Sequence, residues 1–245
     1  MSEGRADTSV QGDRTASGFV GQVTLDGPSG TGKSSVARAV AARLGAAYLD
    51  TGAMYRAATV AVLDAGVDPE DAEAVAAVVA TARIEVGTSA GAEVVRVDGV
   101  DVADRIRGPE VTRTVSPVSA VPAVRRQLVE QQRALVEAAE AVVVEGRDIG
   151  TVVLPEATLK VYLTADPAVR AERRAGQLGL TDPAEVAELA EDLRRRDEYD
   201  SEREDSPLRP ARDAVIVDST DLDRAAAIDR IVSLAATAVA AGERT

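Results

Sequence analysis

A glycine-rich segment carries the clearest chemistry in the sequence. It follows the pattern G-x-x-x-x-G-K-[ST] without a gap, and its residues are Gly27, Pro28, Ser29, Gly30, Thr31, Gly32, Lys33 and Ser34, with Ser35 next in the chain. Glycine lets successive backbone N–H groups approach phosphate oxygens with no Cβ in the way. In this pattern the lysine reaches the β- and γ-phosphates of a nucleotide, and the final hydroxyl ligates Mg²⁺. The segment therefore predicts a site for a nucleoside triphosphate and Mg²⁺.

The residues on either side of this segment predict the elements that such a site needs. Residues 20–26 form a pattern typical of a buried strand, and Val36, Val40 and Leu44 recur every four residues along a helix over 33–44. That helix adds the positive end of its dipole to the phosphate site. This context favours phosphate binding over a chance glycine-rich turn.

Glycine loops of this kind serve GTP switches, ATP-driven motors and small-molecule kinases. A switch needs an N-K-x-D segment, and the chain has none, because its only lysines are Lys33 and Lys160. A motor needs a strand that ends in an acid. The strand ending at Glu145 fits, but Arg147 and Asp148 follow at once, and arginine there suits a second anion better than a hydrolytic water. The sequence therefore favours a kinase that holds an acceptor beside the γ-phosphate.

Arginines provide the positive charge that two phosphorylated ligands need. The chain has 28 basic and 41 acidic residues and a net charge of −13, so only a local cluster can hold two polyanions. Arginine forks make bidentate contacts to phosphate. The three arginines at 170, 173 and 174 lie on one helix with few acids nearby. The full set at element ends or in helices that flank loops is Arg56, Arg147, Arg170, Arg173, Arg174, Arg196 and Arg203.

The composition excludes several other chemistries. The chain of 245 residues is 45% apolar and 28% charged, which fits one globular domain, with or without an insertion. It has no Cys and no His, so disulfides, thiolate or imidazole zinc sites and histidine bases are excluded, and a metal must be a hard ion such as Mg²⁺. A nucleoside monophosphate suits such a chain as acceptor, because its phosphate is already anionic and needs no base. Asp26 or Asp148 would be available where a base is needed.

The charge and the N-terminal sequence also predict location and partners. The acidic balance argues against nucleic acid and anionic membranes as partners. No apolar run is long enough to span a membrane, and residues 1–18 form a polar lead without the apolar core of a secretory signal. We expect a disordered lead over 1–18, a cytoplasmic location and a monomer.

The rest of the pattern is that of an α/β domain with a parallel sheet and an inserted subdomain. From about residue 68 to 113 the alternation of strands and helices gives way to an Ala/Val-rich helix and three short segments, the last two joined by the hairpin signal Asp98-Gly99. Asp166-Pro167 opens a later helix. The other expected elements are strands over 47–49, 84–86, 94–97, 100–102, 141–144, 159–163 and 214–218 and helices over 54–65, 118–139, 183–199 and 222–241.

Four motifs in order resemble those of bacterial cytidylate kinases, and the resemblance covers about residues 20–240. The motifs are Val23–Ser34, Leu49–Arg56, Glu145–Thr151 and Arg196–Arg203 followed by Ser206–Leu208. The resemblance implies a three-layer P-loop fold of the nucleoside monophosphate kinase type. Its core would span 19–67 and 114–245, its inserted NMP-binding subdomain about 68–113, and its lid about 167–182. The implied reaction is ATP- and Mg²⁺-dependent phosphorylation of CMP and dCMP.

The same resemblance implies a role for individual residues, and it includes two departures from the family pattern. Thr51 stands where the family usually has Ser, and Thr31 where it more often has Ala. The implied acceptor-phosphate ligands are Thr51, Arg56, Arg147 and Arg203, with Tyr55 lining the pocket. Ser116, Arg125 and Asp148 would read cytosine, Arg196 and Asp200 would hold the ribose, and the lid arginines Arg170 and Arg174 would join Lys33, Arg147 and Arg203 in catalysis.

The chemistry of base choice agrees with that assignment. A carboxylate such as Asp148 accepts from the exocyclic amine of cytosine, at about 1–3 kcal/mol for a good contact, and opposes the carbonyl of uracil. Two alternatives remain open. One is a related monophosphate kinase or a shikimate-type kinase, and the other is a regulatory ATPase that transfers phosphate only to water.

Overall fold

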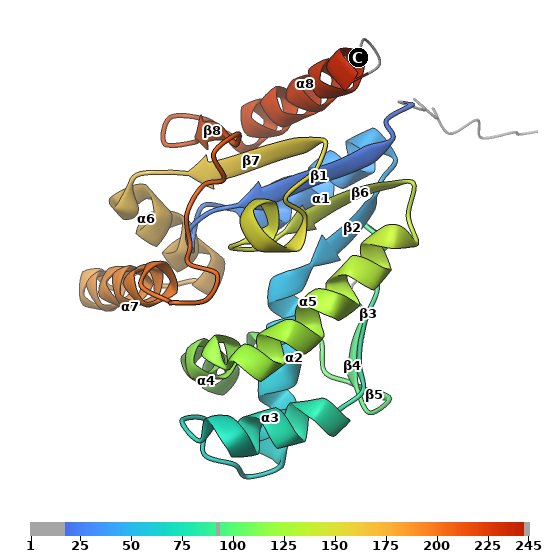
Figure 1. The fold of residues 1–245 in the computed structure, drawn as a ribbon. Helices are drawn as coiled ribbons and strands as arrows, with labels where there is room; N and C mark the ends of the chain where they lie inside the picture. The colour runs from blue at the N-terminus through green and yellow to red at the C-terminus, as the bar shows by residue number, and fades with distance from the viewer. Residues whose placement is uncertain (1–17, 92–93, 243–245) are drawn as a thin grey trace, which may run out of the picture.

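The computed structural model describes residues 18–91 and 94–242, so the lead expected over 1–18 lies, except for Gly18, outside the described residues. Figure 1 shows a twisted central sheet with helices on both faces. All four strand pairings in this sheet are parallel. The strand order is β2-β6-β1-β7-β8, formed by β2 (Ala47–Asp50), β6 (Ala141–Glu145), β1 (Gly21–Asp26), β7 (Leu159–Thr164) and β8 (Val215–Asp218). This confirms the predicted parallel α/β fold.

The strands are apolar on both sides because helices cover both faces of the sheet. Val142 and Val144 pack on one face, against α2 (Thr51–Asp64) and α5 (Pro122–Glu137). Their neighbour Val143 packs on the opposite face, against α1 (Lys33–Leu44), with α8 (Arg224–Gly242) beside it. None of the helices in the described residues is long and apolar enough to cross a membrane.

A second sheet, antiparallel and three-stranded, lies between α2 and α4 in the chain. It consists of β3 (Ile84–Val86), β4 (Val95–Val97) and β5 (Val100–Asp101) in that order. Asp98 and Gly99 between β4 and β5 both have positive φ, 51° and 82°, which confirms the predicted hairpin turn. The sheet shares one continuous apolar core with α2, α5 and α3 (Ala72–Thr81).

The helix predicted over 118–139 is wrong at its N-terminal end. The chain forms two helices there, α4 (Pro109–Ala120) and α5, separated by Val121 in an extended conformation with ψ 117°. Proline disfavours helical geometry in the residue before it, so Pro122 ends one helix and begins the next. Helix α4 begins at Pro109, directly after the 3₁₀ turn η1 (Arg105–Arg107), and it was not predicted because its sequence is polar.

The remaining elements gather where the parallel strands end. Helix α6 (Pro167–Leu178) is capped by Asp166, which accepts from the Ala168 N–H at 2.8 Å, as predicted. Helix α7 (Pro183–Ser201) follows, and Figure 1 shows α6 and α7 beside the carboxyl ends of the strands. A π-helical turn, η2 (Ile149–Val153), follows β6. Ligands of open parallel sheets bind at this edge.

Candidate active site

The phosphate loop, residues 27–34, joins β1 to α1 and needs its glycines for close approach. Gly27 has φ 146°, and a Cβ there would lie 2.0 Å from the backbone oxygen of Leu163. Gly30 has φ 79°, and a Cβ there would lie 2.8 Å from the backbone oxygen of Arg170. Helix α1 begins at Lys33, so the N–H groups of its first turn have no helical acceptor and are available to an anion.

Three cations contact consecutive carbonyl groups of this loop. Arg147 donates to the carbonyl of Gly27, the Nζ of Lys33 to that of Pro28 at 2.7 Å, and Arg170 to that of Ser29 at 3.0 Å. Burial lowers the pKa of Lys33 well below its usual value, and the nearby charge of Arg147 acts in the same direction. At the loop these cations therefore meet main-chain oxygens, and Arg170 also pairs with the carboxylate of Asp197.

Glu145 is a site residue that the sequence prediction left out. Its Oε2 accepts from the hydroxyl of Ser34 at 3.0 Å, and its Oε1 accepts from the hydroxyl of Tyr48. Burial, followed by the charge of Asp50, raises the pKa of Glu145 to about 7. A hydroxyl and a carboxylate at the end of the phosphate loop are the hard oxygen donors that fit Mg²⁺. The acid at the end of the strand was visible in the sequence, but it was set aside as a mark of a motor.

Five arginines near the phosphate loop lie close to one another. We call Arg56, Arg147, Arg174, Arg196 and Arg203 the arginine cluster. Burial lowers the pKa of Arg196 to about 9, with further lowering by Arg147 and Arg56. Burial also lowers the pKa of Arg174, with Arg56 next in effect. Like charges held this close indicate a site built for an anion.

The carboxylate of Asp200 on α7 holds part of the arginine cluster together. Its Oδ2 accepts from Arg147 at 3.0 Å, and its Oδ1 pairs with Arg203. Asp200 is buried. The buried Nε atoms of Arg196 and Arg203 have no hydrogen-bond partner among the described residues. Donors of this kind are costly to bury unless a ligand meets them.

The arginines of α6 divide by role. Arg173 donates to the hydroxyl and the carbonyl of Ser219, at 3.0 and 2.7 Å, so it ties α6 to the segment after β8. Arg174 contacts Gln177 on its own helix at 3.1 Å. Arg170 forms an ion pair with Asp197 of α7. The expectation that these arginines have few acids nearby is therefore wrong for Arg170, because Asp197 reaches it from another helix.

Two of the predicted base-reading residues, Arg125 and Asp148, lie in a buried group of their own. Arg125 pairs with Asp148, and both side chains are more than nine-tenths buried. The guanidinium of Arg125 lies 5.3 Å from the ring centre of Tyr55, whose pKa burial raises to about 12. The structure also places Ser119 here, because its carbonyl accepts from Arg125 at 3.2 Å and its hydroxyl from Arg203 at 3.0 Å.

Two further predicted site residues, Ser116 and Thr51, lie at the start or along the length of helices that border the site. Ser116 lies on α4, one turn before Ser119, where its carbonyl accepts from the Ser119 hydroxyl at 3.0 Å. Thr51 at the start of α2 donates to the backbone carbonyl of Glu145 at 2.7 Å. A Cβ at position 146 would lie 2.7 Å from the Thr51 hydroxyl oxygen, so Gly146 permits this approach.

Asp26 at the end of β1 positions the turn that carries Arg147 and Asp148. Its two carboxylate oxygens accept from the N–H groups of Ile149 at 2.9 Å and Gly150 at 2.8 Å. Burial raises the pKa of Asp26 to about 6, against the effect of these two hydrogen bonds. Both oxygens are engaged, so the structure favours a positioning role for Asp26 over that of a base.

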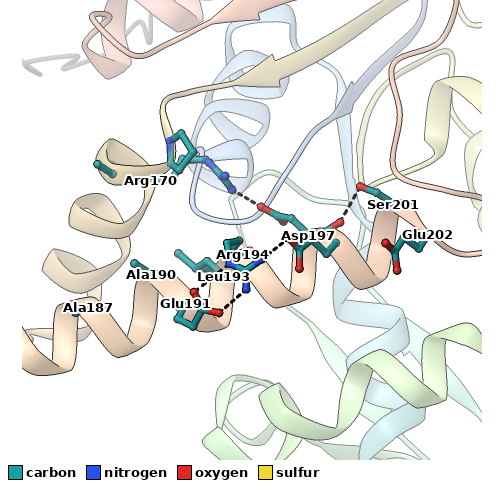
Figure 2. A pocket seen from close by; sticks show the side chains of 12 residues that line it. Arg170, Ala187, Ala190, Glu191, Leu193, Arg194, Asp197, Ser201 and Glu202 are labelled. Atoms are coloured by element: carbon teal, nitrogen blue, oxygen red, sulfur yellow. Dashed lines mark hydrogen bonds and ion pairs between the residues drawn. The ribbon is translucent and has the colours of Figure 1, made fainter.

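A groove of about 650 Å³ lies between α6 and α7, and two of its lining residues, Arg170 and Asp197, contact Ser29 of the phosphate loop. Figure 2 shows Arg170 reaching from α6 toward Asp197 on α7, with Ala187, Ala190 and Leu193 along the same helix. The site is therefore bordered by an open space between the two helices.

A parallel sheet whose first strand runs into a phosphate loop, with a cluster of half-buried arginines beside it, defines the chain as a P-loop phosphotransferase. A family model described as cytidylate kinase matches residues 23–237. The chain belongs to the cytidylate kinase family, and it is a kinase whose activity is that of a nucleoside monophosphate kinase.

Curated relatives match most of the chain at about half identity. A cytidylate kinase of Nocardia farcinica is 52% identical over 223 residues, which cover 90% of this chain and 95% of the relative. One of Rhodococcus opacus is 55% identical over 201 residues, covering 82% and 88%. Among solved structures, a gluconokinase from Sinorhizobium meliloti aligns with 89% of this chain and 93% of its own at 18% identity, with a TM-score of 0.47.

Proposed function

We propose that the protein transfers the γ-phosphoryl group of ATP to CMP and dCMP in the presence of Mg²⁺. The arginine cluster is the observation that carries this proposal. It places several half-buried guanidinium groups beside the phosphate loop in a chain of net charge −13, which is the arrangement that two phosphorylated nucleotides need. The names of the curated relatives support cytidine monophosphate as the acceptor.

The donor side is assigned to the phosphate loop and its flanking residues. The N–H groups of Gly27 and of residues 29–35 would bind the phosphates, and Lys33 would turn from the Pro28 carbonyl to the β- and γ-phosphates. Ser34 would hold Mg²⁺ with Glu145 behind it, since the two are already hydrogen-bonded. Bound Mg²⁺ would neutralise charge on the phosphate oxygens. Ser35 donates to the Gly32 carbonyl at 2.9 Å and so supports the loop itself.

The acceptor side is assigned to the arginine cluster and to the group around Arg125 and Asp148. The acceptor phosphate would meet Thr51 and the arginine cluster, and its negative charge would relieve the crowding there. Asp200 and Arg196 would hold the ribose. Tyr55, Ser116 and Arg125 would surround the base. Arg125 donates to Oδ2 of Asp148, and we assign Oδ1 to the exocyclic amine of cytosine.

Catalysis would consist of positioning and charge stabilisation. The loop N–H groups, Lys33 and the arginines Arg147, Arg170, Arg174 and Arg203 would surround the phosphoryl group as it passes in line between the two nucleotides. Closure of the lid, about 167–182, and of the inserted subdomain, about 68–113, would exclude water from this transfer.

A panel of acceptors tests the proposal. CMP, dCMP, UMP, AMP and shikimate are each supplied with ATP and Mg²⁺, and the nucleoside diphosphate or other product is measured by chromatography. The expected result is fast transfer to CMP and dCMP and much slower transfer to the others. Equal rates of phosphate release with and without any acceptor would instead favour an ATPase, and preferred transfer to AMP or shikimate would favour a related kinase.

A further inference from the structure

Asp197 makes a contact that the roles above do not use. Its Oδ1 accepts a hydrogen bond of 3.0 Å from the backbone N–H of Ser29, in the phosphate loop. Its Oδ2 pairs with Arg170, and Figure 2 shows this pair bridging α6 and α7. Arg170 also donates to the carbonyl of Ser29 at 3.0 Å. One carboxylate therefore joins the loop, α6 and α7.

Both groups that hold Asp197 are groups that a donor phosphate requires. The Ser29 N–H belongs to the loop whose backbone binds anions, and Arg170 is a cation at the mouth of that loop. A carboxylate and a phosphate oxygen are both anionic acceptors, so they compete for the same donors. The side chains of Arg170 and Asp197 are only 10% and 15% exposed, so water does little to weaken the pair.

We propose that Asp197 is a positioning residue that stands in for a donor phosphate oxygen when no nucleotide is bound and is displaced from Ser29 and Arg170 when the donor binds. The inference rests on the proposed function, since it assigns the donor phosphates to this loop. While in place, Asp197 keeps Arg170 at the loop. A donor must first break the contacts of Asp197 with Ser29 and Arg170, so the protein binds the donor more weakly than it would without this carboxylate.

Helix α7 connects this contact to the acceptor side. Asp200, less than one turn beyond Asp197, binds Arg147 and Arg203, and Arg147 also donates to the hydroxyl of Ser29. An acceptor phosphate that engages Arg147 and Arg203 loosens these pairs and so eases the release of Asp197. By linkage, CMP raises donor affinity, and it does so less once the Asp197 carboxylate is removed.

The variant Asp197→Asn tests the proposal, because asparagine keeps the size of the side chain and removes its charge. The measurement is calorimetric binding of tripolyphosphate, and of ATP, without acceptor. The expected result is binding about tenfold tighter than in the wild type, since the charged competitor is gone. Asp192→Asn is the matched control, because Asp192 pairs with Arg195 on the exposed side of the same helix.

Unchanged or weaker tripolyphosphate binding by a folded Asp197→Asn protein would overturn the proposal and leave Asp197 as a structural partner of Arg170. Should that variant fail to fold, Asp197→Ser is measured in the same way and judged by the same outcome. Tripolyphosphate binding involves no turnover. Failure of the wild type to phosphorylate CMP would therefore overturn the proposed function alone, whereas equal binding by an active wild type and its variant would overturn only the role of Asp197.

Discussion

The donor and acceptor sides of the site hold their positive groups by different means. At the phosphate loop, three cations donate to consecutive main-chain carbonyls of one short segment. On the acceptor side, arginines from α2, α6 and α7 and from the segments that follow β6 and α7 approach one another, and one carboxylate, Asp200, holds Arg147 and Arg203. The donor side is thus organised around the main chain of one loop, and the acceptor side around one carboxylate among like charges.

This difference teaches which parts of the site exist before a ligand arrives. The loop is fixed by glycine conformations and by helix α1, so its shape does not depend on bound phosphate. Burial lowers the pKa of Arg174 and Arg196, and the like charges of the cluster lower it further, so the cluster is most stable with an anion present. We expect substitutions on the two sides to separate donor binding, acceptor binding and stability.

The largest effect is expected for Lys33→Ala, which removes the only cation that the loop itself carries. The rate constant kcat/KM for CMP phosphorylation should fall by about a thousandfold or more, because a charge that stabilises the transferring group is lost. The fold should persist, as judged by circular dichroism. Lys160→Ala is the control, since Lys160 pairs with the exposed Asp213 and should keep activity within about threefold of the wild type. Full activity of Lys33→Ala would refute the donor assignment.

Two adjacent arginines of α6 give the next largest contrast. Arg174→Ala should lower kcat by about a hundredfold with little change in Tm, because this side chain belongs to the arginine cluster and its contact with Gln177 is exposed. Arg173→Ala should instead lower Tm by about 3–6 °C with little change in kcat, since it breaks the contacts to Ser219. Steady-state kinetics and thermal unfolding are measured side by side. If the two variants behaved alike, α6 would not have separate structural and catalytic arginines.

A smaller, selective effect is expected for Asp148→Ala. The preference for CMP over UMP, taken as the ratio of the two kcat/KM values, should fall by about tenfold or more, because the acceptor for the cytosine amine is removed. The KM for ATP should hardly change, since the loop is untouched. An unchanged CMP/UMP ratio would place base recognition elsewhere, with Ser119 and Arg125 the next residues to examine.

The smallest effect concerns the pH dependence of stability. The pKa of Asp26 is raised from 3.8 to about 6, so the folded protein binds this proton more tightly than the unfolded chain does. The stabilisation by protonated Asp26 is therefore complete below pH 4. It is lost as the pH rises through 6, which lowers the free energy of unfolding by about 2–3 kcal/mol. Asp26→Asn should flatten the fall in unfolding free energy between pH 4 and 6, as followed by urea unfolding. Asp64→Asn, at an exposed pair with Arg105, should leave that slope as it is.

Local signals predicted most of the fold. Glycine spacing, the Asp98-Gly99 turn and the Asp166 cap each act within a few residues, and each was confirmed where it was predicted. The break between α4 and α5 was not predicted, because the apolar spacing of Val121, Val124 and Leu128 continues across it. Pro122 was the signal in the sequence that indicates this break. Apolar periodicity reports a buried face and does not report whether the backbone is continuous.

The candidate site was harder to predict where it depends on long-range contacts. Asp197 lies 168 residues from Ser29, and no pattern in the sequence joins the two. Ser119 is one turn from Ser116, and only the observed break after Ala120 turns its carbonyl toward Arg125. Glu145 had a visible signal, but its contact with Ser34 depends on the register of two strands that are adjacent only in space.

The position of Glu145 in β6 has a consequence for the distance between the two substrates. Its side chain contacts Ser34 on the donor side, and its own carbonyl accepts from Thr51 on the acceptor side. Under the proposed function, this residue of a buried strand would set the distance between the two nucleotides. Changes in α6 or α7 would then alter how often the nucleotides are brought together, and a shift of β6 would alter how far apart they lie.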